Sequence, residues 1–184
     1  MKLSSVLLEQ LTWHWEHQVR PRLEGLTNEE YRWEPVPGAW SIRPRAEATT
    51  AHAVGGGDLV IDFEGPEPVP PPVTTIAWRL GHVIVGVFGA RNAVRFGGPP
   101  MDYVNMVWPG DAASALALLD EGYGRWVNGV RGLDEATLAA PVGESEGDWA
   151  EAPLIGLVAH INREVIHHLA EVALLRDLFG RKER

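Results

Sequence analysis

The densest group of residues with metal-binding side chains lies near the end of the chain. His160, Glu164 and His168 recur at intervals of four residues. Residues four apart lie one above the other on a helix, so a helix here aligns an imidazole, a carboxylate and a second imidazole on one face. A carboxylate and an imidazole at this spacing can chelate one divalent ion. The pattern therefore predicts a helix with two metal ligands, Glu164 and His168.

His82 is the expected third ligand. It lies beside the stretch of residues 83–90, which is apolar nearly all round a helix and is therefore expected to be buried. A buried polar group without a partner costs about 1–3 kcal/mol, and an ion shared with Glu164 and His168 would remove that cost. Three protein ligands with water in the remaining position form an open catalytic site. Residue types alone leave an alternative open. In it, His82 is a histidine of the core that binds no metal, and Glu164 and His168 are an ordinary pair on the helix surface.

The number of ligands argues against a two-iron site. Glu164 and His167 form one Glu-x-x-His motif, but a di-iron bundle needs a second such motif and two further glutamates from facing helices. The sequence has no second Glu-x-x-His, and residues 74–96 contain no glutamate. A single ion is therefore the expected metal centre.

Composition limits the chemistry further. The chain has 184 residues, seven histidines and no cysteine. Disulfides, zinc ribbons and iron–sulfur clusters are thereby excluded, and any thiol that takes part must come from outside the protein. Sixteen Lys and Arg against 25 Asp and Glu give a net charge of −9, which argues against binding to a nucleic acid backbone.

Hydropathy and length predict the cellular setting and the domain count. The longest apolar stretch, residues 83–90, is far too short to span a membrane. The first residues carry charge too early for the apolar region of a signal peptide. We therefore expect no membrane partner, a cytoplasmic location and one domain over residues 1–184.

Apolar periodicity predicts four long helices. Leu8, Leu11 and Trp15, for example, recur at steps of three and four. The expected helices cover residues 4–24, 74–96, 112–132 and 153–180. The expected residues at their N-termini are Ser4 or Ser5, Thr74 or Thr75, Asp111 and Pro153.

Residues 34–73, between the first two long helices, have a different composition. Prolines and glycines are concentrated here, including residues 55–57 and 70–72, so regular helix is not expected. Residues 59–63 are expected to form a short strand. So long an irregular stretch is typical of a functional loop or lid, and we expect it to close over the site with Trp40 and Trp78 as walls.

A short repeat indicates how the helices are arranged. Gly25-Leu26-Thr27 follows the first long helix and Gly132-Leu133-Asp134 follows the third. Each is followed by an irregular stretch and a long helix. The pattern predicts two similar halves, and hence an all-α protein formed by a four-helix up-down bundle with residues 34–73 inserted between helices one and two.

These features resemble the DinB/YfiT-like superfamily of metalloenzymes. Residues 37–42 are similar to the family's stretch before helix two, and residues 162–168 followed by Glu171 resemble its helix-four signature. Many members have two histidines four apart, and the glutamate at position 164 resembles the mycothiol-dependent maleylpyruvate isomerase branch. The resemblance implies that His82, Glu164 and His168 bind one divalent ion. Zinc is the expected metal, and nickel or another divalent ion is the alternative.

The resemblance also implies a function. A small-molecule substrate would undergo transfer or isomerisation that depends on a low-molecular-weight thiol such as mycothiol. His160, one turn before Glu164, is expected either to orient a ligand or to act as a proton shuttle. One of four arginines, Arg43, Arg45, Arg79 or Arg163, is expected to hold an acidic substrate, and Arg163 is the one assigned to catalysis. A homodimer is expected by analogy with the family. A metal-dependent hydrolase and a non-enzymatic bundle that binds small molecules remain the alternatives.

Overall fold

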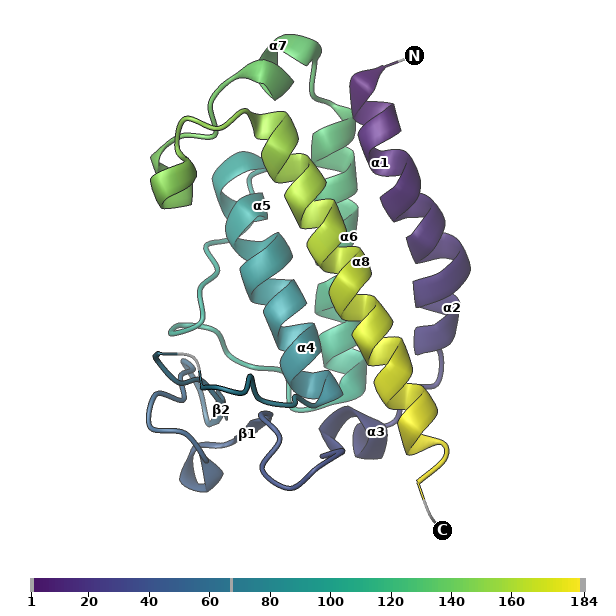
Figure 1. The fold of residues 1–184 in the computed structure, drawn as a ribbon, viewed down its shortest axis with the longest axis vertical. Coiled ribbons are helices and arrows are strands. Elements are labelled where there is room, and N and C mark those ends of the chain that lie inside the picture. The colour runs from purple at the N-terminus through teal and green to yellow at the C-terminus, as the bar shows by residue number, and fades with distance from the viewer. Residues whose placement is uncertain (1, 67, 183–184) are drawn as a thin grey trace.

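The computed structural model describes residues 2–66 and 68–182 and is mainly helical (Figure 1), which confirms the predicted fold class at this level. Helical residues form four long segments. The first joins α1 (Leu3–His14), a π-helical stretch (Trp15–Val19) and α2 (Arg20–Leu23), and the second joins α4 (Ile76–His82), a π-helical stretch (Val83–Gly89) and α5 (Ala90–Arg95). The third and fourth are α6 (Ala112–Arg131) and α8 (Leu154–Phe179).

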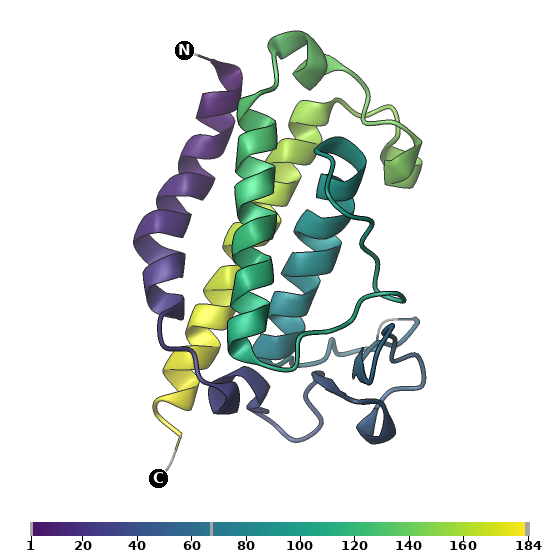
Figure 2. The same cartoon turned by 180° about the vertical axis from the view of Figure 1, so that it is seen from behind.

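The four segments lie side by side (Figures 1 and 2). Helix α8 packs against α1 and α4, and α6 packs against the same two helices. The core between them is apolar, and its fully buried side chains include Leu11, Leu80, Leu119, Trp126 and Ile161. Because α4 and α8 are neighbours, residues in the middle of one helix face residues in the middle of the other. Among the described residues, no helix has the length and hydropathy needed to span a bilayer.

Two of the predicted helix caps are confirmed and one is wrong. The Thr75 hydroxyl accepts a hydrogen bond from the Trp78 backbone N–H at 3.2 Å, and Asp111 caps α6 through Ser114. Neither Ser4 nor Ser5 caps α1, because the helix begins at Leu3 and Ser4 is buried against the core inside its first turn. Burial of a seryl side chain leaves it unable to serve as the exposed first residue of a helix.

The π-helical stretch Val83–Gly89 begins directly after His82 and was not predicted. A Cβ atom at Gly86 would collide with the Tyr103 hydroxyl, and one at Gly89 would collide with Met101. The two glycines thus let the loop after α5 lie directly on the helix. This close approach places Tyr103 beside His82, and π-helical turns are often found at functional sites.

Residues 34–73 contain a small sheet. Strand β1 (Ile42–Pro44) pairs antiparallel with β2 (Leu59–Ile61), with Ile42 opposite Ile61. The strand predicted at residues 59–63 is therefore confirmed over residues 59–61. Strand β1 was not predicted, because a tripeptide that contains proline carries no strand signal. The carboxylate of fully buried Asp62 accepts hydrogen bonds from Arg43 Nε at 2.8 Å and from the Ser41 N–H at 3.0 Å. These contacts hold the sheet against the end of α4.

Two short helices occupy corresponding places in the two halves of the chain, one after the first long helical segment and one after the third. Helix α3 (Asn28–Arg32) follows the first long segment and begins with a capping box formed by Thr27 and Glu30. Helix α7 (Glu135–Ala139) follows α6 and is capped by Asp134. Each half of the chain therefore contains a long helix, a short capped helix, an irregular stretch and a second long helix, as the short repeat predicted.

Asn162 connects three of the long segments and provides a test of the core. Its side chain accepts a hydrogen bond from Trp126 Nε1 at 3.0 Å and donates one to the Leu7 carbonyl at 2.7 Å. Replacement Asn162→Ala leaves the buried Trp126 indole N–H without its acceptor, so the free energy of unfolding should fall by about 1–3 kcal/mol in urea denaturation. Asn128→Ala on the exposed face of α6 should change it by less than about 0.5 kcal/mol. Equal losses would show that the hydrogen bonds of Asn162 do not stabilise the core.

Candidate metal centre

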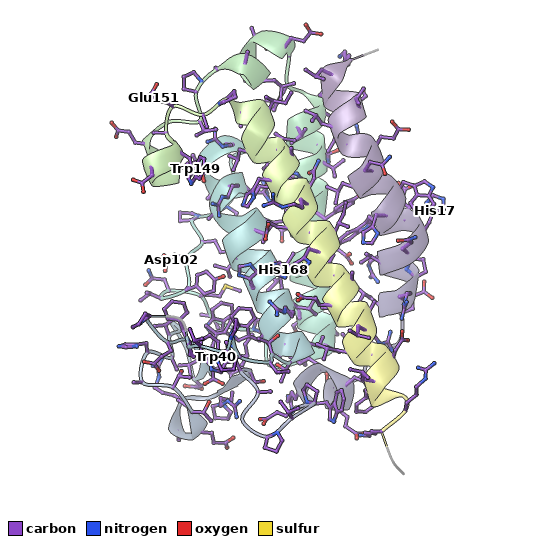
Figure 3. All side chains as sticks on the ribbon, in the orientation of Figure 1. His17, Trp40, Asp102, Trp149, Glu151 and His168 are labelled. Atoms are coloured by element: carbon purple, nitrogen blue, oxygen red, sulfur yellow. The ribbon has the colours of Figure 1, made fainter. Side chains whose placement is uncertain are left out.

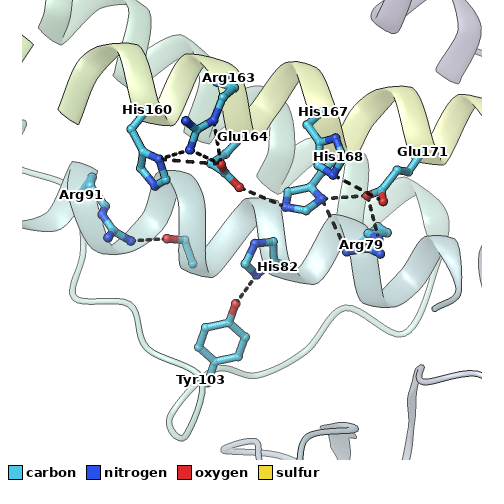
Figure 4. Close-up of polar contacts among 11 residues, drawn as sticks. Arg79, His82, Arg91, Tyr103, His160, Arg163, Glu164, His167, His168 and Glu171 are labelled. Carbon is cyan, nitrogen blue, oxygen red and sulfur yellow. Dashed lines mark hydrogen bonds and ion pairs between the residues drawn. The ribbon is translucent and has the colours of Figure 1, made fainter. Parts of the chain in front are cut away.

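His82 and His168 face each other where α4 packs against α8 (Figure 4). Their ring centroids lie 4.7 Å apart, and the rings meet edge to face at 88°. His168 is only 8% exposed, although it is a polar residue. Two histidines separated by more than eighty positions in the sequence therefore share one buried location, as the sequence predicted.

Glu164, the third residue of the predicted set, contacts His168 on α8. Its Oε2 atom lies 3.4 Å from His168 Nε2, one helical turn further along α8. Two ligands of a tetrahedral ion, each at about 2.0–2.1 Å, lie about 3.4 Å from each other. The separation between these two atoms is therefore the one that a shared zinc-sized ion requires.

Hydrogen bonds hold the other nitrogen of each ring. His82 Nδ1 lies 2.7 Å from the Tyr103 hydroxyl, and His168 Nδ1 lies 2.8 Å from Glu171 Oε2. When Nδ1 donates its proton to such a partner, the lone pair of Nε2 is free to face the space between the helices, which is the usual arrangement in metal sites. Glu171 could have been found from its spacing of three after His168, whereas no local signal connects Tyr103 with His82.

The protonation states suit metal ligands. Burial lowers the pKa of His82 to about 4, and the positive charges of His168 and Arg79 act in the same direction. Burial alone would raise the pKa of Glu164, but a hydrogen bond from Arg163 and the charge of His160 outweigh it, so that this pKa is lowered. At neutral pH His82 is neutral and Glu164 is ionised, the forms in which these groups bind cations.

His160 and Arg163 lie at the exposed end of the same cluster. Arg163 Nη2 donates to His160 Nδ1 at 2.6 Å and to Glu164 Oε1 at 2.9 Å. His160 Nδ1 is itself 3.7 Å from that carboxylate oxygen. The two residues therefore contact one oxygen of Glu164, while its other oxygen faces His168. Their catalytic roles remain predictions.

A second set of possible ligands overlaps the first. Within residues 2–66 and 68–182, the group of three with ligand atoms within 4.8 Å of one another consists of His167, His168 and Glu171. The sequence prediction did not include this set, because His167 was treated as the exposed neighbour of His168. His167 is 61% exposed at its side chain, and Glu171 also forms an ion pair with Arg79 Nε at 3.0 Å. The two sets share only His168.

A row of aromatic side chains extends from the cluster to the surface. Trp78 stacks on His82 with ring centroids 5.6 Å apart, Trp40 lies 6.1 Å from Trp78, and exposed Phe63 lies 6.5 Å from Trp40. The carbonyl of Asp62 fixes Trp78 by accepting a hydrogen bond from its indole N–H at 2.9 Å. Trp78 of α4 therefore lies beside His82, and the 34–73 segment adds Trp40 and Phe63 to the row.

Fold and cluster together define a mainly helical protein with a His/Glu site between two packed helices. A sequence model of the DinB superfamily matches residues 10–172, and the chain belongs to this superfamily. The resemblance inferred from the sequence is confirmed at this level. Comparison with the curated proteins gave no match, and comparison with the solved structures gave none either.

The pKa of His82 can be measured directly. In chelator-treated protein, NMR titration of the imidazole signals should give a pKa of about 4 for His82, below the ordinary value of 6.5. The His82 signal is assigned as the one that is missing in the His82→Gln variant. As the pH falls, His82 is protonated in the unfolded chain before it is protonated in the folded protein, and this favours unfolding. The contribution of His82 to the free energy of unfolding is therefore complete above pH 6.5 and declines towards pH 4. A measured value near 6.5 would mean that the ring is solvated and not packed against α8.

Proposed function

We propose that the chain is a metal-dependent enzyme that binds one divalent ion between α4 and α8 through His82, Glu164 and His168. The 3.4 Å separation of His168 Nε2 and Glu164 Oε2 carries this proposal. If the His168 ring is neutral with its proton on Nδ1 toward Glu171, Nε2 and Glu164 Oε2 are both acceptors, and a cation between them would satisfy both. His82 supplies a neutral third donor from the opposite helix.

The alternative set with His167 and Glu171 fits less well. Arg79 already pairs with Glu171, so the negative charge that would attract an ion is balanced. Glu171 also holds His168 Nδ1, which is the role of a residue that orients a ligand. His167 is largely exposed, and an ion at that position would compete with water.

We interpret the four helical segments as an up-down four-helix bundle in one domain over residues 1–184, with residues 34–73 as an insertion. The packing of α6 and α8 on both α1 and α4 supports this interpretation. In this arrangement the proposed ligands come from facing positions in the bundle, where such helical proteins commonly build metal sites. The insertion then covers one side of the site with Trp40 and Trp78.

The expected reaction is transfer or isomerisation of a small molecule with the help of a low-molecular-weight thiol. Zinc suits the His, Glu, His donor set, and when bound it would lower the pKa of a thiol or water in the open position, with nickel as the next choice. The chain has no cysteine, so the sulfur must come from a molecule such as mycothiol. The glutamate at position 164 supports the thiol-dependent branch over hydrolysis.

His160 and Arg163 have distinct proposed roles. An arginine only donates, so the 2.6 Å contact makes His160 Nδ1 an acceptor and places the proton of the neutral ring on Nε2. In this neutral form His160 can donate a hydrogen bond to a substrate from Nε2, and it can pass a proton on only after the ring has first taken one up. Arg163 is mostly exposed, and its guanidinium can hold an acidic group of a substrate that approaches Glu164 from the solvent side.

Metal titration tests the proposed ligands. Protein prepared without a histidine tag and stripped with chelator should bind one zinc ion in calorimetry. His82→Gln, Glu164→Gln and His168→Gln should each weaken binding by about 100-fold or more, because each removes one of three ligands. His167→Gln is the matched control and should bind like the wild type. Loss of binding in His167→Gln with normal binding in His82→Gln would assign the ion to the other set.

Turnover tests the enzyme proposal. The zinc-loaded protein should accelerate conjugation of mycothiol to an activated aryl halide, and His160→Gln should lower kcat by about 100-fold without loss of zinc. His17→Gln is the control, because Figure 3 shows His17 on α1/α2 away from His168. Hydrolysis of an activated ester without any thiol requirement would support the hydrolase instead. Absence of both activities in zinc-loaded protein would support a binding protein.

A further inference from the structure

Two arginines on α5 hold a carboxylate outside the proposed metal ligands. Glu146 Oε2 lies 3.0 Å from Arg91 Nη2, and Glu146 Oε1 lies 3.9 Å from Arg95 Nη2. The Glu146 side chain is only 10% exposed. A charged side chain from a surface loop is thus inserted between two guanidinium groups.

Glu146 does not satisfy these guanidinium groups. In the part of the chain that the structure describes, the Nε atoms of Arg91 and Arg95 are both buried and have no hydrogen-bond partner. A buried donor without a partner costs about 1–3 kcal/mol. A carboxylate that meets an arginine side-on can accept from Nε and Nη2 together, an arrangement that Glu146 does not reach.

The loop that carries Glu146 contains two glycines with positive φ. It is a short 3-10 helical turn, Glu144–Trp149, between Gly143 with φ 83° and an internal Gly147 with φ 57°. The other five residues of the turn are exposed, and one of them, Trp149, is 74% exposed. Glu146 is therefore the side chain that fastens the turn to α5. Rotation at two glycines can release it without strain in a side-chain-bearing residue.

The arginines belong to the helical segment that carries His82. Arg91 Nη1 donates to the carbonyl of Gly86, four residues after His82. A Cβ atom at Gly86 would lie 3.2 Å from His82 Nδ1, so this turn of the helix touches both the guanidinium group and the metal centre. Figure 4 shows Arg91 and His82 on the helical segment that runs alongside α8.

We propose that Arg91 and Arg95 form a carboxylate-binding subsite next to the metal centre, and that Glu146 fills this subsite until a substrate carboxylate displaces it. The assignment to a carboxylate, and not to a phosphate, follows from the group that the protein itself places there. The proposal rests on the proposed function only in locating the reacting end of the substrate at His82, Glu164 and His168. Release of Glu146 would open the turn at the same time.

Titration with glutarate tests the subsite. Binding of glutarate is followed by NMR through the indole N–H signal of Trp149, which reports movement of the turn Glu144–Trp149. Removal of the internal competitor in Glu146→Gln should tighten glutarate binding by about tenfold, because the subsite is then no longer occupied in the free protein. Arg91→Gln should abolish saturable binding, and Arg91→Lys should weaken it. Arg125→Gln on α6 is the matched control and should bind like the wild type.

The titration is carried out on metal-free and zinc-loaded protein, which separates the two proposals. In metal-free protein, glutarate should bind more tightly to Glu146→Gln than to the wild type and should not bind to Arg91→Gln. This result supports the subsite even if the protein binds no zinc. Equal affinities of Glu146→Gln and the wild type would overturn the proposal, and this result does not depend on the folding of an arginine variant. Saturable binding of inorganic phosphate without binding of glutarate would also overturn it.

Discussion

The packing of α4 against α8 buries polar groups in an apolar interface, and the local structure is organised around satisfying them. His82 and His168 meet edge to face at 4.7 Å, where water is largely excluded. Each imidazole needs a partner for Nδ1, and Tyr103 and Glu171 supply them. Arg79 then balances the charge of Glu171. What remains facing the interface is a set of nitrogen and oxygen lone pairs, which is the chemical reason to infer an ion there.

Several irregular features serve this interface. The π-helical stretch after His82 and the glycine at position 86 allow the loop that carries Tyr103 to lie on the helix. The 34–73 segment, held by the buried carboxylate of Asp62, places Trp40 against Trp78 of α4, which stacks on His82. The turn Glu144–Trp149 covers the far end of the same helical segment. The long helices thus fix the positions of His82, Glu164 and His168, and the connections between helices determine what surrounds them.

Much of the fold could be predicted from local signals. Apolar periodicity located the four long helical segments, and the caps at Thr75 and Asp111 were identified because a capping hydroxyl or carboxylate acts on its own first turn. The cap at Ser4 failed because burial, which depends on tertiary packing, overrode a local preference. Strand β1 and the π-helical stretch escaped prediction for the same reason: each exists through contacts with residues distant in the sequence.

The sequence by itself determined that His160, Glu164 and His168 share one helical face, because a helix aligns residues four apart whatever surrounds it. It also determined that any thiol must be external, since the chain has no cysteine. Only the tertiary structure decided that His82 meets His168, that Tyr103 holds His82, and that Glu146 lies between Arg91 and Arg95. These pairings join segments far apart in the chain, and their distances depend on how the helices and loops pack together.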